Sequence, residues 1–216
     1  MPSIDKGRDR AIKSRYFGLT GLPASGKGTF KDLLLAELDR RGIGHAYHSL
    51  SDELRAEVRF RGLPVDRDVL RSMGHELRLK HGSGVLSERV VERIARDARQ
   101  GRQVPVTVVD AIRNPAEVRV LRESLGDDFV LVAIEAPVEA IIQRIRARAR
   151  EGDVVQDDEL ARQVLAAEMG VDEPEHGHNI AECIAMADVH IDNGGPLSTL
   201  EAAVQRLVEE QVAPAL

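Results

Sequence analysis

The sequence has very few aromatic residues and almost no cysteine. Of its 216 residues, 3% are aromatic, none is Trp, and Cys183 is the single cysteine. One cysteine excludes an intramolecular disulfide and any metal site built from cysteines alone. The scarcity of rings argues against a platform on which single-stranded bases stack. The core must therefore be built from Leu, Val, Ile and Ala.

The sequence also lacks an excess of positive charge and any long apolar run. Lys and Arg total 30 against 36 Asp and Glu, a formal net charge of −6, which argues against polymeric nucleic acid as a partner. Residues 1–15 are too polar for a secretory signal, and apolar runs such as 129–134 are too short to cross a bilayer. We expect a cytoplasmic protein without a membrane partner, as a monomer or homodimer.

Short apolar runs alternate with segments that have helical spacing. The runs predict strands at about 16–20, 44–50, 104–110, 129–136 and 188–191. Strands this apolar are covered on both faces, so the pattern favours an α/β fold, with a five-stranded parallel sheet between two helical layers. Residues 51–100 are predicted to be almost wholly helical. This stretch is too long for one crossover helix, and we expect it to form a lobe above the sheet.

A glycine-rich loop follows the first predicted strand and opens the first long helix, which is the context that a phosphate-binding P-loop requires. Glycine permits positive φ, so successive N–H groups can face one anion, and the helix N-terminus and Lys27 add positive charge. The strict pattern has Ser or Thr directly after the Lys, whereas here Gly28 precedes Thr29. The predicted phosphate contacts are Gly21, Pro23, Ala24, Ser25, Gly26, Lys27, Gly28 and Thr29.

Two further groups of charged residues have a spacing that suggests chemistry. Asp110 closes the most apolar predicted strand, and a carboxylate at the end of a central parallel strand points into the ligand crevice. Its alternative role as a helix cap is better filled by Asn114. Arg144 and Arg148 share one helix face, where like charges repel unless an anion lies between them. Their alternative is a solvated face beside the acidic loop at 151–158.

Three motifs after the loop carry a family resemblance over about residues 15–210. They are Ser49-Leu50-Ser51-Asp52-Glu53-Leu54-Arg55, then Asp110-Ala111-Ile112-Arg113, then Ala187-Asp188-Val189-His190-Ile191-Asp192-Asn193-Gly194-Gly195. In this order, and with the Gly-Lys-Gly-Thr loop, the chain resembles small P-loop kinases of the adenylate kinase and dephospho-CoA kinase type. It looks most like dephospho-CoA-kinase-related and deoxynucleotide-kinase-like proteins. It departs from their pattern at Ala24 and Ala111, where they have Gly.

The resemblance implies a P-loop NTPase fold in one domain, 1–216. Its core would comprise about 15–50, 101–140 and 185–216, with an acceptor lobe at about 51–100 and a short lid at about 141–160. ATP would be the donor, and Thr29 and Asp110 would hold Mg²⁺. The implied catalytic residues are Lys27, Asp110, Arg113, Arg144 and Arg148, and the implied acceptor contacts are Ser51, Asp52, Arg55, Arg78 and Arg113.

Several of these implied roles have structural alternatives. Asn193 and Gly194 would lie near the donor adenine, or they form an ordinary turn. Arg113 would grip a phosphate or form a surface salt bridge, and Ser51 and Asp52 would contact the acceptor or cap a helix. Two histidines without a third ligand, His176 and His178, are a weak metal signal.

The resemblance implies transfer of the γ-phosphoryl group to a nucleotide-like acceptor, foremost a (deoxy)nucleoside monophosphate. The acceptor's base would have Tyr47 and Phe60 as the nearest rings. Transfer to a nucleoside alcohol such as dephospho-CoA is one alternative, and a non-catalytic ATP-binding regulatory protein is another. A GTPase switch is disfavoured because the Asn-Lys-x-Asp loop that reads guanine is missing from the sequence.

Overall fold

A computed structural model describes residues 14–148 and 158–212 and has a five-stranded parallel sheet at its centre. The strands are β1 (Arg15–Thr20), β2 (His45–Ser49), β3 (Val106–Ile112), β4 (Phe129–Glu135) and β5 (Val189–Asp192). Their order is β2-β3-β1-β4-β5, and every neighbouring pair is parallel. The predicted fold class is confirmed. Because the strand order reverses beside β1, the crevice at the carboxyl ends of β1 and β3 is where a ligand is expected.

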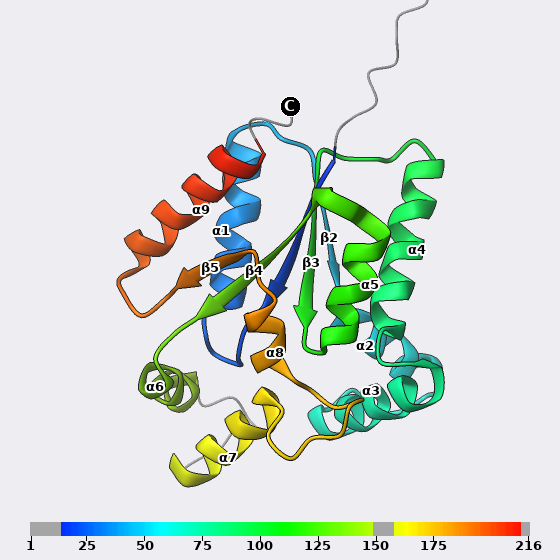
Figure 1. Ribbon diagram of the computed structural model, residues 1–216, viewed down its shortest axis with the longest axis vertical. Coiled ribbons are helices and arrows are strands. Elements are labelled where there is room, and N and C mark those ends of the chain that lie inside the picture. Colours follow the sequence, from blue (N-terminus) through cyan, green and yellow to red (C-terminus); the bar gives the residue numbers. More distant parts are fainter. Residues whose placement is uncertain (1–13, 149–157, 213–216) are drawn as a thin grey trace, which may run out of the picture.

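Helices cover both faces of the sheet (Figure 1). On one face α1 (Lys27–Arg40) and α9 (Leu197–Gln211) pack through a cluster that includes Phe17 and Phe30. On the other face lie α4 (Val85–Arg99), α5 (Pro115–Leu125) and α8 (Ile180–Ala185), with Phe129 and Cys183 in their core. Aliphatic side chains make up most of both clusters, as the composition predicts. The sheet is thus a rigid platform that presents its polar carboxyl edge to one end of the molecule.

The remaining helices gather at that carboxyl edge (Figure 1). They are α2 (Leu50–Phe60), α3 (Arg67–His81), α6 (Val138–Arg148) and α7 (Asp158–Met169). The predicted lobe at 51–100 therefore divides, because α2 and α3 lie over the edge while α4 runs back beside α5. Residues 149–157 of the predicted lid lie outside the described residues, and so does the side chain of Arg148. Within the described ranges, no helix is long and apolar enough to cross a bilayer.

Side-chain caps fix the first residues of α3 and α5. Asp66 accepts a hydrogen bond from the Val69 N–H at the start of α3. Asn114 caps α5 as predicted, Glu117 completes a reciprocal capping box, and Pro115 is the first residue of the helix. Such caps contribute about 0.5–2 kcal/mol each. The cap of α5 starts that helix directly after Arg113, so it also fixes where the Arg113 side chain emerges.

Candidate functional site

The phosphate loop lies between β1 and α1, and hydrogen bonds from other parts of the chain hold it in place. Gly26 has φ 104°, and a Cβ there would lie 1.8 Å from Asn193 Nδ2, so only glycine fits. Asn193 donates from that nitrogen to the Ser25 carbonyl at 2.7 Å. The buried Asn193 side chain therefore holds the loop, while the neighbouring Gly194 is exposed. The predicted proximity of both residues to the donor adenine stays a prediction.

Arg144 of α6 also holds the phosphate loop in place. Its guanidinium donates to the Asn193 carbonyl at 2.6 Å and to the Ser25 carbonyl at 3.2 Å. It does not line the cavity described below. The sequence predicts a lid arginine here, whereas the structure places this guanidinium on the backbone of the phosphate loop. The role of Arg144 in the transition state stays a prediction.

The loop has the features that a bound phosphate would satisfy. No side chain caps the N-terminus of α1 in the described part of the chain. The Ser25 hydroxyl is buried and has no hydrogen-bond partner among the described residues. A Cβ at Gly28 would meet nothing within 4 Å. An uncapped helix N-terminus, an orphaned hydroxyl and open space together fit the phosphates of a nucleotide.

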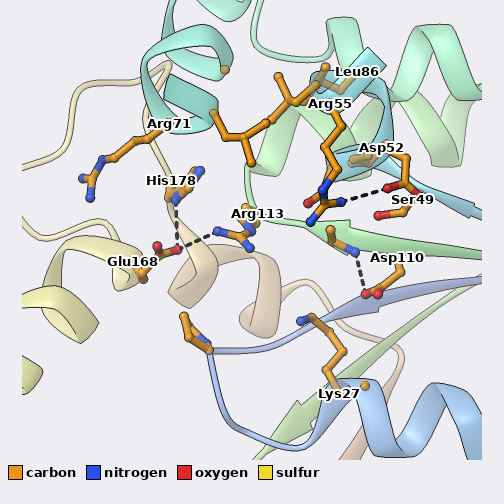
Figure 2. A pocket seen from close by; sticks show the side chains of 18 of the residues that line it. Lys27, Ser49, Asp52, Arg55, Arg71, Leu86, Asp110, Arg113, Glu168 and His178 are labelled. Carbon is orange, nitrogen blue, oxygen red and sulfur yellow. Dashed lines mark hydrogen bonds and ion pairs between the residues drawn. The ribbon is translucent and has the colours of Figure 1, made fainter. Parts of the chain in front are cut away.

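A cavity of about 710 Å³ opens beside the loop and brings most of the predicted site residues together (Figure 2). This volume is in the range of small-ligand pockets. The predicted site residues that line this cavity are Pro23, Ala24, Lys27, Gly28, Ser51, Asp52, Arg55, Arg78, Asp110 and Arg113. Thr29 is exposed and is not in the lining. Gly28 and Asp110 line the cavity, and the predicted magnesium contact of Thr29 stays a prediction.

Asp110 is held at the floor of this cavity by two donors. The strand predicted to end at Asp110 continues to Ile112, so the carboxylate leaves β3 before its end. Its oxygens accept from the Ala111 N–H at 2.6 Å and from the Tyr47 hydroxyl at 3.2 Å. Burial, together with the nearby Asp110 charge, raises the pKa of Tyr47 to about 12, so this hydroxyl remains a donor at neutral pH. Tyr47, named as one of the rings nearest to an acceptor base, lines the cavity and orients this carboxylate.

Of the two residues predicted to hold Mg²⁺, Asp110 lines the cavity. Among the described residues, no group of three or more His, Cys, Asp or Glu could hold a metal ion. Mg²⁺ is often bound by one or two carboxylates together with substrate phosphates and water, so a single Asp beside a phosphate loop fits it. The two histidines of the weak metal signal contact other groups. His176 Nε2 lies 2.8 Å from His75 Nε2, and His178 Nδ1 lies 2.9 Å from Glu168.

Glu117 is a buried residue that sequence reasoning did not select for the site. Its Oε1 accepts from the Arg78 guanidinium at 2.9 Å, and its Oε2 accepts from the Arg113 N–H at 2.8 Å. Both side chains of the Arg78–Glu117 pair are buried. Arg78, predicted to bind substrate, thus lines the cavity but is fixed as part of the scaffold. The available signal was the Asn-x-x-Glu capping box that starts α5.

The remaining cavity arginines also face carboxylates. Arg55 donates to Asp52 at 2.8 Å, three residues away on α2. Ser49 is at the N-cap of this helix but makes no capping hydrogen bond. Arg113 approaches Glu168, a buried residue of α7 that no local pattern identifies because it is brought in from a distant helix. Phe60, the other ring proposed for the base, is 89% exposed and outside the cavity lining.

The chain matches a protein-family model and is similar to several relatives. An AAA domain model matches residues 20–162. A UPF0200 protein from Methanoregula boonei is 31% identical over 88% of this chain and 94% of that protein. One from Methanothrix thermoacetophila is 33% identical over 91% and 97%. The UPF0200/UPF0201 protein of Archaeoglobus fulgidus is 29% identical, but the chain spans 56% of its length.

Solved structures with a similar fold include shikimate kinases. The enzyme from Acinetobacter baumannii, in complex with shikimate, has a TM-score of 0.51 at 15% identity, covering 95% of this chain and 97% of that one. The enzyme from Bacteroides thetaiotaomicron has a TM-score of 0.54 at 16% identity, covering 91% and 97%. At this identity the likeness shows the fold alone, a P-loop α/β kinase fold.

Proposed function

Because this chain belongs to the UPF0200 family, and its P-loop domain has a kinase-like fold, we propose that it is a phosphotransferase. Its donor would be ATP with Mg²⁺, and its acceptor a nucleotide-like molecule, foremost a (deoxy)nucleoside monophosphate. One observation carries this proposal: a single cavity has Lys27 and Asp110 on one side and Arg55 and Arg113 on the other. The cavity thus has room for a donor phosphate and an acceptor phosphate close together.

The phosphate loop would bind the donor. Lys27, the N-terminus of α1 and the Ser25 hydroxyl would contact the phosphates, and Asp110 would hold Mg²⁺ with its carboxylate oriented by Tyr47. When bound, Mg²⁺ supplies positive charge to the β- and γ-phosphates. The loop itself is kept rigid by Asn193 and Arg144. Phosphoryl transfer then depends mainly on positioning and on electrostatic stabilisation.

The far side of the cavity would bind the acceptor. Arg55 and Arg113 suit a phosphate because a guanidinium forms two parallel hydrogen bonds to an oxyanion. Aliphatic side chains of the same lining would contact the rest of the acceptor, and they include Leu50, Leu54, Leu70 and Leu86. An acceptor phosphate oxygen would bond to the γ-phosphorus as the bond to the β-phosphate oxygen breaks. ADP would then leave with that bond's electron pair.

A second acceptor class is a hydroxyl compound such as dephospho-CoA. Asp52 and Glu168 offset part of the positive charge of Arg55 and Arg113, which favours an acceptor with less negative charge. Asp110 would then accept the hydroxyl proton. The likeness to shikimate kinases adds no evidence on the acceptor beyond the fold.

The test is a screen for ADP release over nucleoside monophosphates, deoxynucleoside monophosphates and dephospho-CoA. Lys27→Ala should lower turnover by about a hundredfold or more, because a cation that stabilises the transferring phosphoryl group is lost. Lys80→Ala is a matched control, since Lys80 is exposed and outside the cavity lining. Full turnover in Lys27→Ala would contradict the proposal, and ATP binding without turnover over the panel would favour a regulatory protein.

A further inference from the structure

Two arginines of the cavity are held in very different ways. Arg78 is 4% exposed and donates to Glu117 through Nη2 at 2.9 Å and Nε at 3.2 Å. Losing one partner of such a buried pair is strongly destabilising, so Arg78 is fixed. The Arg113 side chain is 31% exposed, and its Nη1 lies 3.4 Å from Glu168 Oε2. This is longer than the roughly 2.7–2.9 Å of a close charge-assisted hydrogen bond, so its guanidinium is held loosely.

The backbone of Arg113 is nevertheless fixed on both sides. Its N–H donates to Glu117 Oε2 at 2.8 Å, and its carbonyl accepts from the Asn179 N–H at 2.8 Å. The side chain can therefore change its partner without any movement of the chain from which it projects.

A second donor converges on the same carboxylate. His178 Nδ1 lies 2.9 Å from Glu168 Oε2, the oxygen that faces Arg113 (Figure 2). Glu168 is 4% exposed, yet all three side chains line the cavity. An arginine and a histidine that meet at one anionic oxygen have the arrangement with which proteins bind phosphate or carboxylate groups.

We propose that Arg113, His178 and Glu168 form an anion-exchange site. The Glu168 carboxylate holds the position that the acceptor's phosphate monoester takes when it binds to Arg113 and His178. The inference rests on the proposed function, since it assigns this part of the cavity to the acceptor. Glu168 is then a specificity-determining residue, because an incoming anion must displace the Glu168 carboxylate, whereas an uncharged acceptor leaves it in place.

The test measures binding without ATP, by calorimetric titration of the full chain with inorganic phosphate, AMP and adenosine. Glu168→Gln keeps the shape of the side chain but removes its charge. Phosphate and AMP should bind about tenfold more tightly to this variant, while adenosine affinity stays the same. Any binding at the phosphate loop is common to both proteins and cancels in the comparison.

Glu76→Gln is the matched control. Glu76 is a carboxylate of α3 paired with Arg61, and neither of these two residues lines the cavity. Its anion affinity should stay within about twofold of that of the native chain. A Glu168→Gln variant that binds both anions with unchanged or weaker affinity would overturn the proposal.

If Glu168→Gln does not fold, the native chain labelled with ¹⁵N-histidine decides instead. The His178 resonance should shift on saturation with AMP and should not shift with adenosine. A His178 resonance that does not shift with AMP would overturn the exchange site. Neither measurement depends on turnover. A chain that shows the exchange but never releases ADP would contradict the proposed function and leave this site intact.

Discussion

At the level of single residues, Glu117 has the greatest structural consequence. It is fully buried, caps α5, pairs with Arg78 of α3 and accepts the N–H of Arg113. One carboxylate thus joins Arg78 of the cavity lining to the end of β3. Ala24 and Ala111 have φ of 61° and 66°, where the resembling kinases have Gly. Each costs on the order of 1 kcal/mol relative to glycine, so the site keeps some local strain.

Glu117→Gln should therefore destabilise the fold strongly. Arg78 would keep its charge while buried without a carboxylate, which costs about 3–5 kcal/mol in the free energy of unfolding. Urea denaturation measures this loss, and Glu123→Gln on the exposed side of α5 is the control. A loss below about 1 kcal/mol would mean that Arg78 finds another partner or reaches water.

At the level of elements, α6 supports the phosphate loop through Arg144. The sequence predicts a helix here with Arg144 and Arg148 on one face, and α6 contains Arg144. The hydrogen-bond acceptors of Arg144 could not be predicted. They are the Ser25 and Asn193 carbonyls, which come from two turns far apart in the sequence that the parallel sheet brings together. The same limit applies to Glu168. Local motifs predicted the phosphate loop, Asp110 and Arg113. The contact of Tyr47 with Asp110 joins two neighbouring strands, and the contacts of Glu117 with Arg78 and of Glu168 with Arg113 join residues far apart in the sequence.

Arg144→Ala should weaken ATP binding itself. Loss of the guanidinium frees the phosphate loop, and we expect the Kd for ATP to rise about tenfold, measured by calorimetric titration. Arg146→Ala, two residues further along an exposed face, is the control. A fall in turnover with an unchanged Kd for ATP would instead support the lid role that the resemblance implies.

For the whole molecule, acid should lower stability in two steps. Burial and the neighbouring His176 lower the pKa of His75 from 6.5, and burial lowers that of His48. The folded state then binds fewer protons than the unfolded chain, so stability is greatest above pH 6.5 and falls below it. Hydrogen bonding from Arg40 lowers the pKa of Glu37 from 4.5 to about 2, so its contribution is lost later, between those values.

Urea denaturation at pH 7 and pH 5.5 tests the first step. The free energy of unfolding should fall on acidification, and it should fall less in His75→Gln, which keeps a neutral polar side chain beside His176. Residual acid sensitivity in that variant would come from His48. Equal losses in the two proteins would remove His75 as a cause.

The buried thiol of Cys183 has a practical consequence. It is fully inaccessible on α8, and burial raises its pKa well above the usual range, so it does not form the reactive thiolate near neutral pH. As the chain has no other cysteine, its surface is naturally free of reactive sulfur. Spectroscopic labels could be attached at single engineered cysteines on α3 and α7 without a cysteine-free background, and the distance between them would report whether a ligand draws the two walls of the cavity together.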